Sequence, residues 1–357
     1  MLALSQESMA GMRWRKNRER SLLVLMTGGY VYLLLALPSG VQWMSGGVVR
    51  QSSPVAEPGC SSQGKHFKLL TRAAHPRIKR HPGDNLHVNL TGPSWRPWGG
   101  DHPGSPCVNY ETRLGSKLTR VLLMSYPCSG NSWLRYLLEG ATGFFTGSLY
   151  KEKPLYEGGL LGEMEEVWSE RTLVQKTHGV MFHSLERNDL SERYNHINSS
   201  LPSILLLRNP VRAIVSSWFL LLQSGSNRHK AQVDPSTFNT NLFRFYVDQA
   251  VSLWEEMATD RLLWSSKPVY VLHYEHLLQN TTHQLRHLLH FLSVPVDEGR
   301  LACVSSHLTG PFKRRGNKTL DPFTREEKQR LSKAVQRVNR LLLVLGYPRP
   351  PVYEELP

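Results

Sequence analysis

The sequence predicts an α/β fold, a three-layer domain in which helices cover both faces of a parallel β-sheet. Short, continuous apolar segments, such as residues 121–125 and 203–208, are followed by segments with helical periodicity. Continuous apolar strands are typical of sheets buried on both faces, and parallel sheets are buried in this way. In such folds, ligands bind at the carboxyl ends of the strands.

The predicted elements follow one another from residue 118, where core-like patterning begins. We expect strands, each a short apolar run, at residues 121–125, 172–176, 203–208 and 269–273. We expect helices, where apolar residues recur at helical spacing, at residues 131–142, 211–223, 243–258, 281–292 and 324–345. Pro210 suits the start of the second helix, and Thr324 with Glu327 has the spacing of a capping box at the start of the last one.

The N-terminal region predicts a single membrane span. Residues 21–38 carry no charge, and the next charged residue is Arg50. About 20 apolar residues are enough to cross a bilayer as a helix. Five basic residues precede this run, so the positive-inside rule places the N-terminus in the cytosol. We therefore expect a type II membrane protein with a cytosolic tail at residues 1–20 and a signal-anchor at 21–44; a cleaved signal peptide is the alternative.

Residues 45–115 are expected to form a lumenal stem. This region is rich in Pro, Gly, Ser and His, and proline at high density breaks helices and central strands. We expect the parts near Trp95 and Trp98 to pack on the catalytic domain. The chain of 357 residues is long enough for two average domains, but this interpretation leaves one large domain at residues 116–357.

The composition limits the classes of partner. A net charge of +14 favours anionic glycans, anionic membranes or phosphorylated small molecules. Nucleic acid is disfavoured as a partner because the predicted membrane span places the domain in the secretory lumen. The four cysteines are scattered and lack the Cys/His spacing of a zinc site, so no metal is expected. One or two disulfides are compatible with this number, and their pairing stays open, as does the oligomeric state.

The stretch S-Y-P-C-S-G-N-S-W, from Ser125 to Trp133, joins the first predicted strand to the first predicted helix. Its small residues, among them Ser129, Gly130 and Ser132, let backbone N–H groups approach an anion, and the helix N-terminus adds the positive end of its dipole. A phosphorylated ligand is the natural occupant. The alternative is an ordinary strand-to-helix turn that uses Ser and Gly only as turn residues.

Two further strand ends carry candidate functional side chains. After the second predicted strand, K-T-H places Lys176 and His178 on one face, and a histidine can accept a proton near neutral pH. After the third strand, Arg208 precedes a helix that carries Ser216, and a guanidinium at this place can bind a phosphate bidentately. The alternatives are ordinary surface groups, or an arginine paired with a carboxylate.

A late basic stretch, P-F-K-R-R-G-N-K-T, concentrates positive charge with no acid nearby. Uncompensated charges around a glycine suit closure over a phosphate. The alternative is a solvated basic loop. The candidate residues here are Arg314, Arg315 and Gly316.

Together these segments resemble the sulfotransferase family, which uses 3′-phosphoadenosine 5′-phosphosulfate (PAPS) as donor. The resemblance covers about residues 118–347. It implies the P-loop-like sulfotransferase fold and PAPS as co-substrate without a metal. It implies that His178 is the catalytic base, that Lys176 acts beside it, and that Trp133 flanks the adenine. The residues implied to bind PAPS are Ser129, Gly130, Asn131, Ser132, Trp133, Arg208, Ser216, Arg314, Arg315 and Gly316.

Finer detail is similar to the Golgi WSCD branch, named for WSC-domain-containing sialate O-sulfotransferases. The stretches S-G-N-S-W-L-R-Y-L-L-E-G-A-T-G and T-G-S-L-Y-K carry this similarity. It implies a Golgi membrane protein whose acceptor is a glycan, with sialic acid as the implied sugar. Two features depart from the pattern: the short stem leaves no room for WSC modules, and Cys128 stands where most sulfotransferases place a lysine. The role of that lysine then falls to Lys176, Arg135 or helix-end N–H groups.

Three alternatives to sulfuryl transfer differ in what they require of the sequence. A P-loop kinase needs G-x-x-x-x-G-K-[ST], and residues 125–132 lack the first glycine and the lysine. A Golgi glycosyltransferase would need a D-x-D motif, which does not occur in the sequence. A catalytically silent membrane protein that binds PAPS or anionic glycans is the third, and Cys128 favours it. The presence of His178 and Lys176 favours an enzyme.

Overall fold

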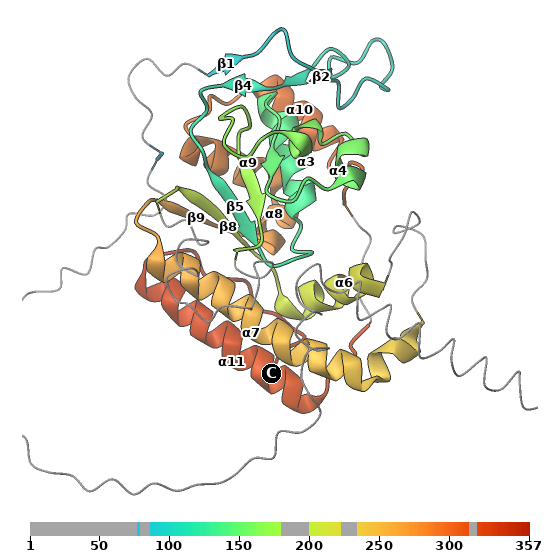
Figure 1. The fold of residues 1–357 in the computed structure, drawn as a ribbon, viewed down its shortest axis with the longest axis vertical. Helices are drawn as coiled ribbons and strands as arrows, with labels where there is room; N and C mark the ends of the chain where they lie inside the picture. The colour runs from blue at the N-terminus through green and yellow to red at the C-terminus, as the bar shows by residue number, and fades with distance from the viewer. Residues whose placement is uncertain (1–76, 79–85, 180–199, 223–233, 314–319) are drawn as a thin grey trace, which may run out of the picture.

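A parallel sheet forms the centre of the molecule, as the sequence predicts (Figure 1). The computed structural model describes residues 77–78, 86–179, 200–222, 234–313 and 320–357. Within these residues the central sheet has five strands, and every pair of neighbours is parallel. Their order across the sheet is β6 (Gly147–Ser148), β7 (Gln175–Thr177), β5 (Leu122–Ser125), β8 (Ser203–Leu207) and β9 (Val269–His273).

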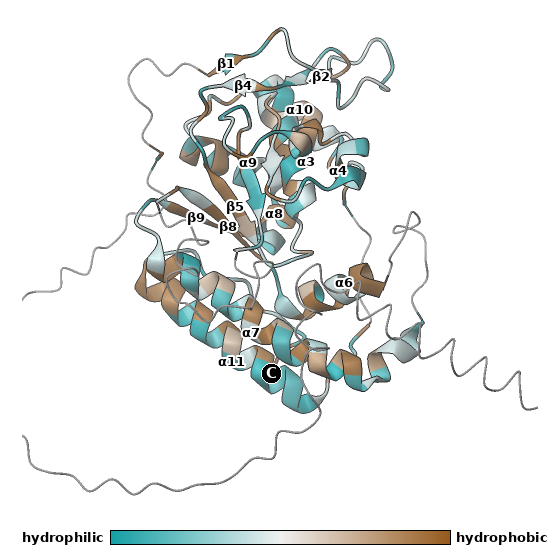
Figure 2. Ribbon diagram, in the orientation of Figure 1, coloured by the Kyte–Doolittle hydropathy of each residue, from teal (hydrophilic) through white to brown (hydrophobic). Residues whose placement is uncertain are grey.

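Helices cover both faces of this sheet, so the three-layer α/β fold class is confirmed (Figure 1). One face packs against α3 (Asn131–Thr142), α9 (Thr281–Phe291) and α10 (Glu298–Ser306). The other packs against α6 (Pro210–Leu222), α7 (Asn241–Trp264) and α11 (Arg325–Val344). Side chains alternate between the two cores: Leu123 and Ile204 belong to the first, Met124 and Leu205 to the second. Figure 2 shows the apolar colouring of the central strands that results.

Most predicted elements are present with bounds close to those expected. Helix α3 and strand β9 have the predicted bounds, and the capping box of Thr324 and Glu327 opens α11. Strand β7 begins three residues later than expected, and α7 continues to Trp264. Several short elements have no counterpart in the prediction. They are β6, α4 (Lys153–Glu157), the 3₁₀ helices η1 (Leu161–Met164) and η3 (Pro235–Asn239), α8 (Tyr274–Gln279) and α10.

Part of the predicted stem packs on the domain. Two small antiparallel pairs form there, β1 (His87–Val88) with β4 (Gly115–Ser116) and β2 (Ser94–Trp95) with β3 (Thr112–Arg113). The expected packing of Trp98 is confirmed: its side chain is buried, and its indole N–H donates to the Tyr136 hydroxyl at 3.2 Å. Trp95 is 43% exposed.

A disulfide between Cys107 and Cys303 joins this region to α10 and settles one pairing that the sequence left open. The sequence-based boundary at residue 116 therefore falls inside the packed region rather than at its edge. The predicted cytosolic tail and the predicted span at residues 21–44 lie outside the described residues. Among the helices that are described, none combines the length and apolarity needed to cross a membrane.

Candidate functional site

Three neighbouring strands bring the predicted site residues to one edge of the sheet. Strand β5 lies between β7 and β8, with Met124 opposite Thr177 and Ser125 opposite Leu206. The loop after β5 is therefore flanked by His178, which follows β7, and by Arg208, which follows β8. Because all three strands are parallel, their carboxyl ends share this edge, where ligands of α/β folds bind.

The loop after β5 has a backbone that suits its small residues. Cys128 and Gly130 both have positive φ, 59° and 95°, and Gly130 is the N-cap residue of α3. A Cβ atom on Gly130 would lie 2.5 Å from the ring of Tyr274. The loop therefore requires glycine at this position for two reasons, its left-handed conformation and the close approach of an aromatic ring.

Two polar groups in this loop are poised for a ligand. The Ser129 hydroxyl and the Asn131 side-chain oxygen are buried and lack a hydrogen-bond partner among the described residues. The Asn131 amide donates to the Ser125 hydroxyl at 2.9 Å, which fixes the orientation of the side chain. Buried polar groups are normally hydrogen-bonded, and the Ser129 hydroxyl can donate to a phosphate or sulfate, as can free backbone N–H groups at the start of α3; the Asn131 oxygen can only accept, so an anion does not satisfy it. Ser132 is partly exposed in the first turn of α3.

Arg208 ties the end of β8 to the loop. Its guanidinium donates to the Cys128 carbonyl oxygen at 2.5 Å and lies 4.7 Å from the ring centroid of Tyr274. Its own carbonyl oxygen accepts from the Trp254 indole at 3.1 Å. Ser216 is in the second turn of the following helix, α6, and is partly exposed. The structure thus places Arg208 directly at the loop, as the sequence predicts.

Trp133 is buried rather than open to a nucleobase. Its side chain is 2% exposed, and its indole N–H donates to the Leu308 carbonyl oxygen at 2.7 Å. Tyr274 meets the ring edge-on, and the Lys313 ammonium group lies 4.7 Å from the ring centroid. The predicted stacking of Trp133 against the adenine stays a prediction. Arg314, Arg315 and Gly316, the predicted basic loop, lie outside the described residues.

His178 is held as a neutral imidazole. Its Nδ1 lies 2.7 Å from the Ser125 carbonyl oxygen, which can only accept, so Nδ1 carries the proton and Nε2 has the lone pair. Burial, followed by the nearby Lys176 charge, lowers the pKa of His178 to about 3. The Tyr150 ring stacks on the imidazole at 5.3 Å, and the Tyr150 hydroxyl accepts from the backbone N–H of His178 at 2.6 Å.

Lys176 is buried beside His178 and paired with a residue that the motifs did not reveal. Its ammonium group forms an ion pair with the Glu152 carboxylate and lies 5.5 Å from the Tyr150 ring centroid. Glu152 is the N-cap residue of α4. The segment that follows β6 therefore contributes two groups, Tyr150 and Glu152, to the surroundings of the predicted catalytic pair.

Arg135 cannot take the role of the lysine that most sulfotransferases have at the position of Cys128. The prediction that named Arg135 for this role is therefore wrong. Arg135 is a residue of α3 whose side chain is fully buried and forms an ion pair with Glu163. The same guanidinium donates to the Thr146 hydroxyl at 2.8 Å and to the Thr146 carbonyl oxygen at 2.9 Å. All of these contacts are internal to the domain, so Arg135 has a structural role.

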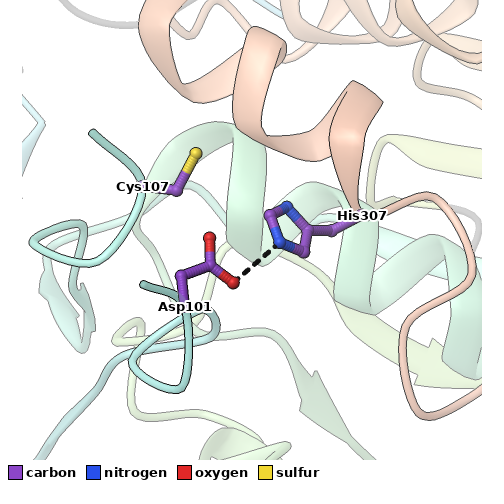
Figure 3. Close-up of side chains that lie close together, drawn as sticks. All are labelled: Asp101, Cys107 and His307. Atoms are coloured by element: carbon purple, nitrogen blue, oxygen red, sulfur yellow. Dashed lines mark hydrogen bonds and ion pairs between the residues drawn. The ribbon is translucent and has the colours of Figure 1, made fainter. Parts of the chain in front are cut away.

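One cluster of metal-type side chains occurs in the described part of the chain, and it lies away from the strand ends. Asp101, Cys107 and His307 converge there (Figure 3). The sulfur of Cys107 is bonded to Cys303, and both ring nitrogens of His307 are in hydrogen bonds, to Asp101 at 3.0 Å and to the Cys303 carbonyl oxygen at 2.8 Å. These contacts attach residues 101–107 to α10 and to His307 at its end. Because Cys107 is in a disulfide, it has no thiolate to offer to a metal.

Comparisons with known proteins point to one family. A family model described as a sulfotransferase domain matches residues 118–334. A WSCD family member of Drosophila melanogaster is 30% identical over 248 residues, which cover 68% of this chain and 72% of that protein. A WSCD family member of Drosophila pseudoobscura pseudoobscura is 32% identical over 212 residues, 57% of this chain and 60% of that protein. The chain therefore spans 60% to 72% of the length of these two relatives.

Two solved structures resemble the fold more distantly. A sulfotransferase from Alicyclobacillus acidocaldarius has 14% identity and a TM-score of 0.36, and the match covers 65% of this chain and 97% of that one. A mouse sulfotransferase, SULT7A1 complexed with PAP, has 15% identity and a TM-score of 0.36, with 64% and 89% covered.

Proposed function

This chain belongs to the sulfotransferase family, and we propose that it transfers a sulfuryl group from PAPS to a hydroxyl of a glycan. One observation carries the proposal. Three adjacent strand ends bring together a loop with an unsatisfied buried hydroxyl, that of Ser129, a guanidinium at that loop and a neutral histidine. A phosphosulfate needs the first two, and a hydroxyl nucleophile needs the third.

The reaction follows from the protonation state of His178. Its Nε2 takes the proton of the acceptor hydroxyl while that oxygen attacks sulfur. The S–O bond to the 5′-phosphate breaks, and adenosine 3′,5′-bisphosphate (PAP) leaves with the bonding electrons. Backbone N–H groups of the loop and the Lys176 ammonium group stabilise the charge that develops on the leaving phosphate. A general base contributes about 10²- to 10⁴-fold when its pKa lies near the working pH, so the anionic donor, bound beside Lys176, has to raise the pKa of His178 from about 3 for this contribution to be reached.

The acceptor and the location are finer parts of the same proposal. The resemblance of the sequence to the WSCD branch implies a sialylated glycan, and the net charge of +14 is suited to an anionic acceptor. The uncharged run at residues 21–38 supports a type II signal-anchor with the domain in the Golgi lumen.

A silent PAPS-binding or glycan-binding protein is the second candidate. Cys128 favours it, because the thiol lacks the charge of the lysine that usually neutralises the leaving phosphate. The pairing of Lys176 with Glu152 favours it too, since this cation is already neutralised in the ligand-free protein. Nucleotide binding without turnover would identify this candidate.

Transfer of radioactive sulfate from labelled PAPS tests the proposal. The full chain in detergent would be incubated with sialylated, galactosylated and glycosaminoglycan acceptors. Label on one glycan class establishes the reaction and its acceptor. PAP binding without transfer to any acceptor would support the silent binder instead.

A further inference from the structure

We infer that Glu152 is a positioning residue that holds the Lys176 ammonium group in place and releases it when the anionic donor binds. The inference rests on the proposed function, because it takes Lys176 to act on the donor. No motif pointed to Glu152, and its role follows from the contacts that it makes.

The ion pair between Glu152 and Lys176 joins two side chains of unequal exposure. The Lys176 side chain is 6% exposed, whereas the Glu152 side chain is 38% exposed. An ammonium group so deeply buried needs a counter-ion to stay charged. Glu152 supplies it in the ligand-free protein, and the Tyr150 ring adds a weaker attraction at 5.5 Å. Because the carboxylate borders solvent, it can leave the ammonium group without entering an apolar environment.

The backbone of Glu152 is fixed from the interior of the domain. Its N–H donates to the Glu163 carboxylate at 3.0 Å, and the other oxygen of Glu163 is paired with Arg135. Neither Glu163 nor Arg135 has an exposed side chain. Thr146 completes this buried network through its bonds to Arg135. The position of Glu152 is therefore set by buried groups, while its side chain keeps the freedom to rotate.

The Glu152 side chain is not needed to cap a helix. Glu152 is the N-cap residue of α4, yet within the described structure its carboxylate makes no cap hydrogen bond. Glutamate is also not among the residues preferred at that position. Helix capping therefore does not explain why a carboxylate occupies position 152. The ion pair with Lys176 explains it.

A donor that reaches His178 must compete with the Glu152 carboxylate for the Lys176 ammonium group. Lys176 lies two residues before His178 on the same strand end, and its charge already contributes to the low pKa of that histidine. The sulfate and phosphate groups of the donor are anions that would take the place of the carboxylate. Two opposite consequences follow. Glu152 weakens nucleotide binding, and it holds the Lys176 ammonium group in place for the chemical step.

The test compares PAP binding and turnover in Glu152→Gln and in the wild-type full chain. Isothermal titration calorimetry would report PAP binding, and labelled PAPS would report kcat and KM. We expect Glu152→Gln to bind PAP about two- to fivefold more tightly, the range that corresponds to losing one partly exposed ion pair, and to show a lower kcat. Glu152→Asp restores the charge and should return PAP affinity toward the wild-type value.

Two further variants separate this role from a structural one. Glu157→Gln is the matched control, because Glu157 lies in the same short helix and pairs with Lys153 at 3.5 Å instead; its PAP affinity should not change. In a Lys176→Met background, Glu152→Gln should no longer tighten PAP binding, since the released cation is missing.

The outcomes distinguish the inference from the proposed function. If the wild-type chain binds PAP but Glu152→Gln binds it equally or more weakly, Glu152 does not compete for Lys176 and the inference is wrong, while the sulfotransferase proposal stands. If the wild-type chain does not bind PAP at all, the proposed function is wrong. The inference is then wrong as well, because it rests on that function.

Discussion

Replacing Gly130 with alanine should destabilise the domain and displace the loop after β5. The new Cβ would lie 2.5 Å from Cε2 and 2.6 Å from Cδ2 of Tyr274, closer than real Cβ atoms approach. The Tyr274 ring cannot simply move, because it meets Trp133 edge-on and lies under Arg208. Left-handed backbone costs a residue with a side chain about 1 to 2 kcal/mol, and overpacking costs about 1 to 3 kcal/mol. We therefore expect a loss of about 2 to 5 kcal/mol.

The assay is thermal unfolding, with Gly100→Ala as the matched control. Gly100 has no atom within 4 Å of its would-be Cβ. A loss of this size lowers the melting temperature by about 4 to 20 °C in a domain of this size. In a Tyr274→Ala background, where the clash is absent, Gly130→Ala should cost only the backbone component relative to Tyr274→Ala alone. Equal melting temperatures for Gly130→Ala and Gly100→Ala would refute the geometry described for the loop.

Two other predictions concern stability. Cys303→Ala frees a loop that spans 196 residues and should lower the free energy of unfolding by up to about 5 kcal/mol, as measured by urea denaturation under non-reducing conditions; an unchanged midpoint would mean that the disulfide is not formed. The second prediction is a loss of stability on acidification. Burial lowers the pKa of His178 to about 3 and of His273 to about 4, so the unfolded chain binds more protons than the folded one below about pH 6.5. Burial raises the pKa of Glu139 to about 7, which acts in the opposite direction between about pH 4.5 and 7. Because the contribution of one glutamate opposes those of two histidines, the free energy of unfolding should fall by about 1.4 kcal/mol for each pH unit between pH 6.5 and 4.5. Glu139→Gln should steepen that dependence, and a flat urea midpoint across this range would contradict the burial of both histidines.

The parts of the fold that the sequence predicts are those with a strong local signal. The apolar runs at β5, β8 and β9 are long enough to identify as strands, and the start of α11 carries its own capping box. Strand β6 consists of Gly147 and Ser148, which have no strand propensity, and it is held by pairing with β7. Such an edge strand depends on tertiary contacts, and no local pattern predicts it.

The same distinction applies to the site. The loop follows β5, Arg208 follows β8, and Lys176 and His178 lie at the end of β7, so the parallel topology brings them together. Tyr150 and Glu152 follow β6 and reach the site only because that strand pairs with β7. The signal available for them was the stretch T-G-S-L-Y-K, which marks a segment but does not say what it contacts. Arg135 was misassigned for a related reason, because helical spacing alone does not show that Glu163 and Thr146 enclose it.

The central claim is that His178 is the base for sulfuryl transfer, and one paired measurement tests it most directly. Initial rates of sulfate transfer and PAP dissociation constants would be determined for the wild-type chain, His178→Ala and His287→Ala, where His287 is an exposed histidine of α9. The account predicts that His178→Ala loses at least about 100-fold in rate while its PAP affinity changes by less than about threefold, and that His287→Ala matches the wild type. Full turnover by His178→Ala would contradict the account, and loss of PAP binding together with turnover would show that His178 serves the nucleotide or the fold.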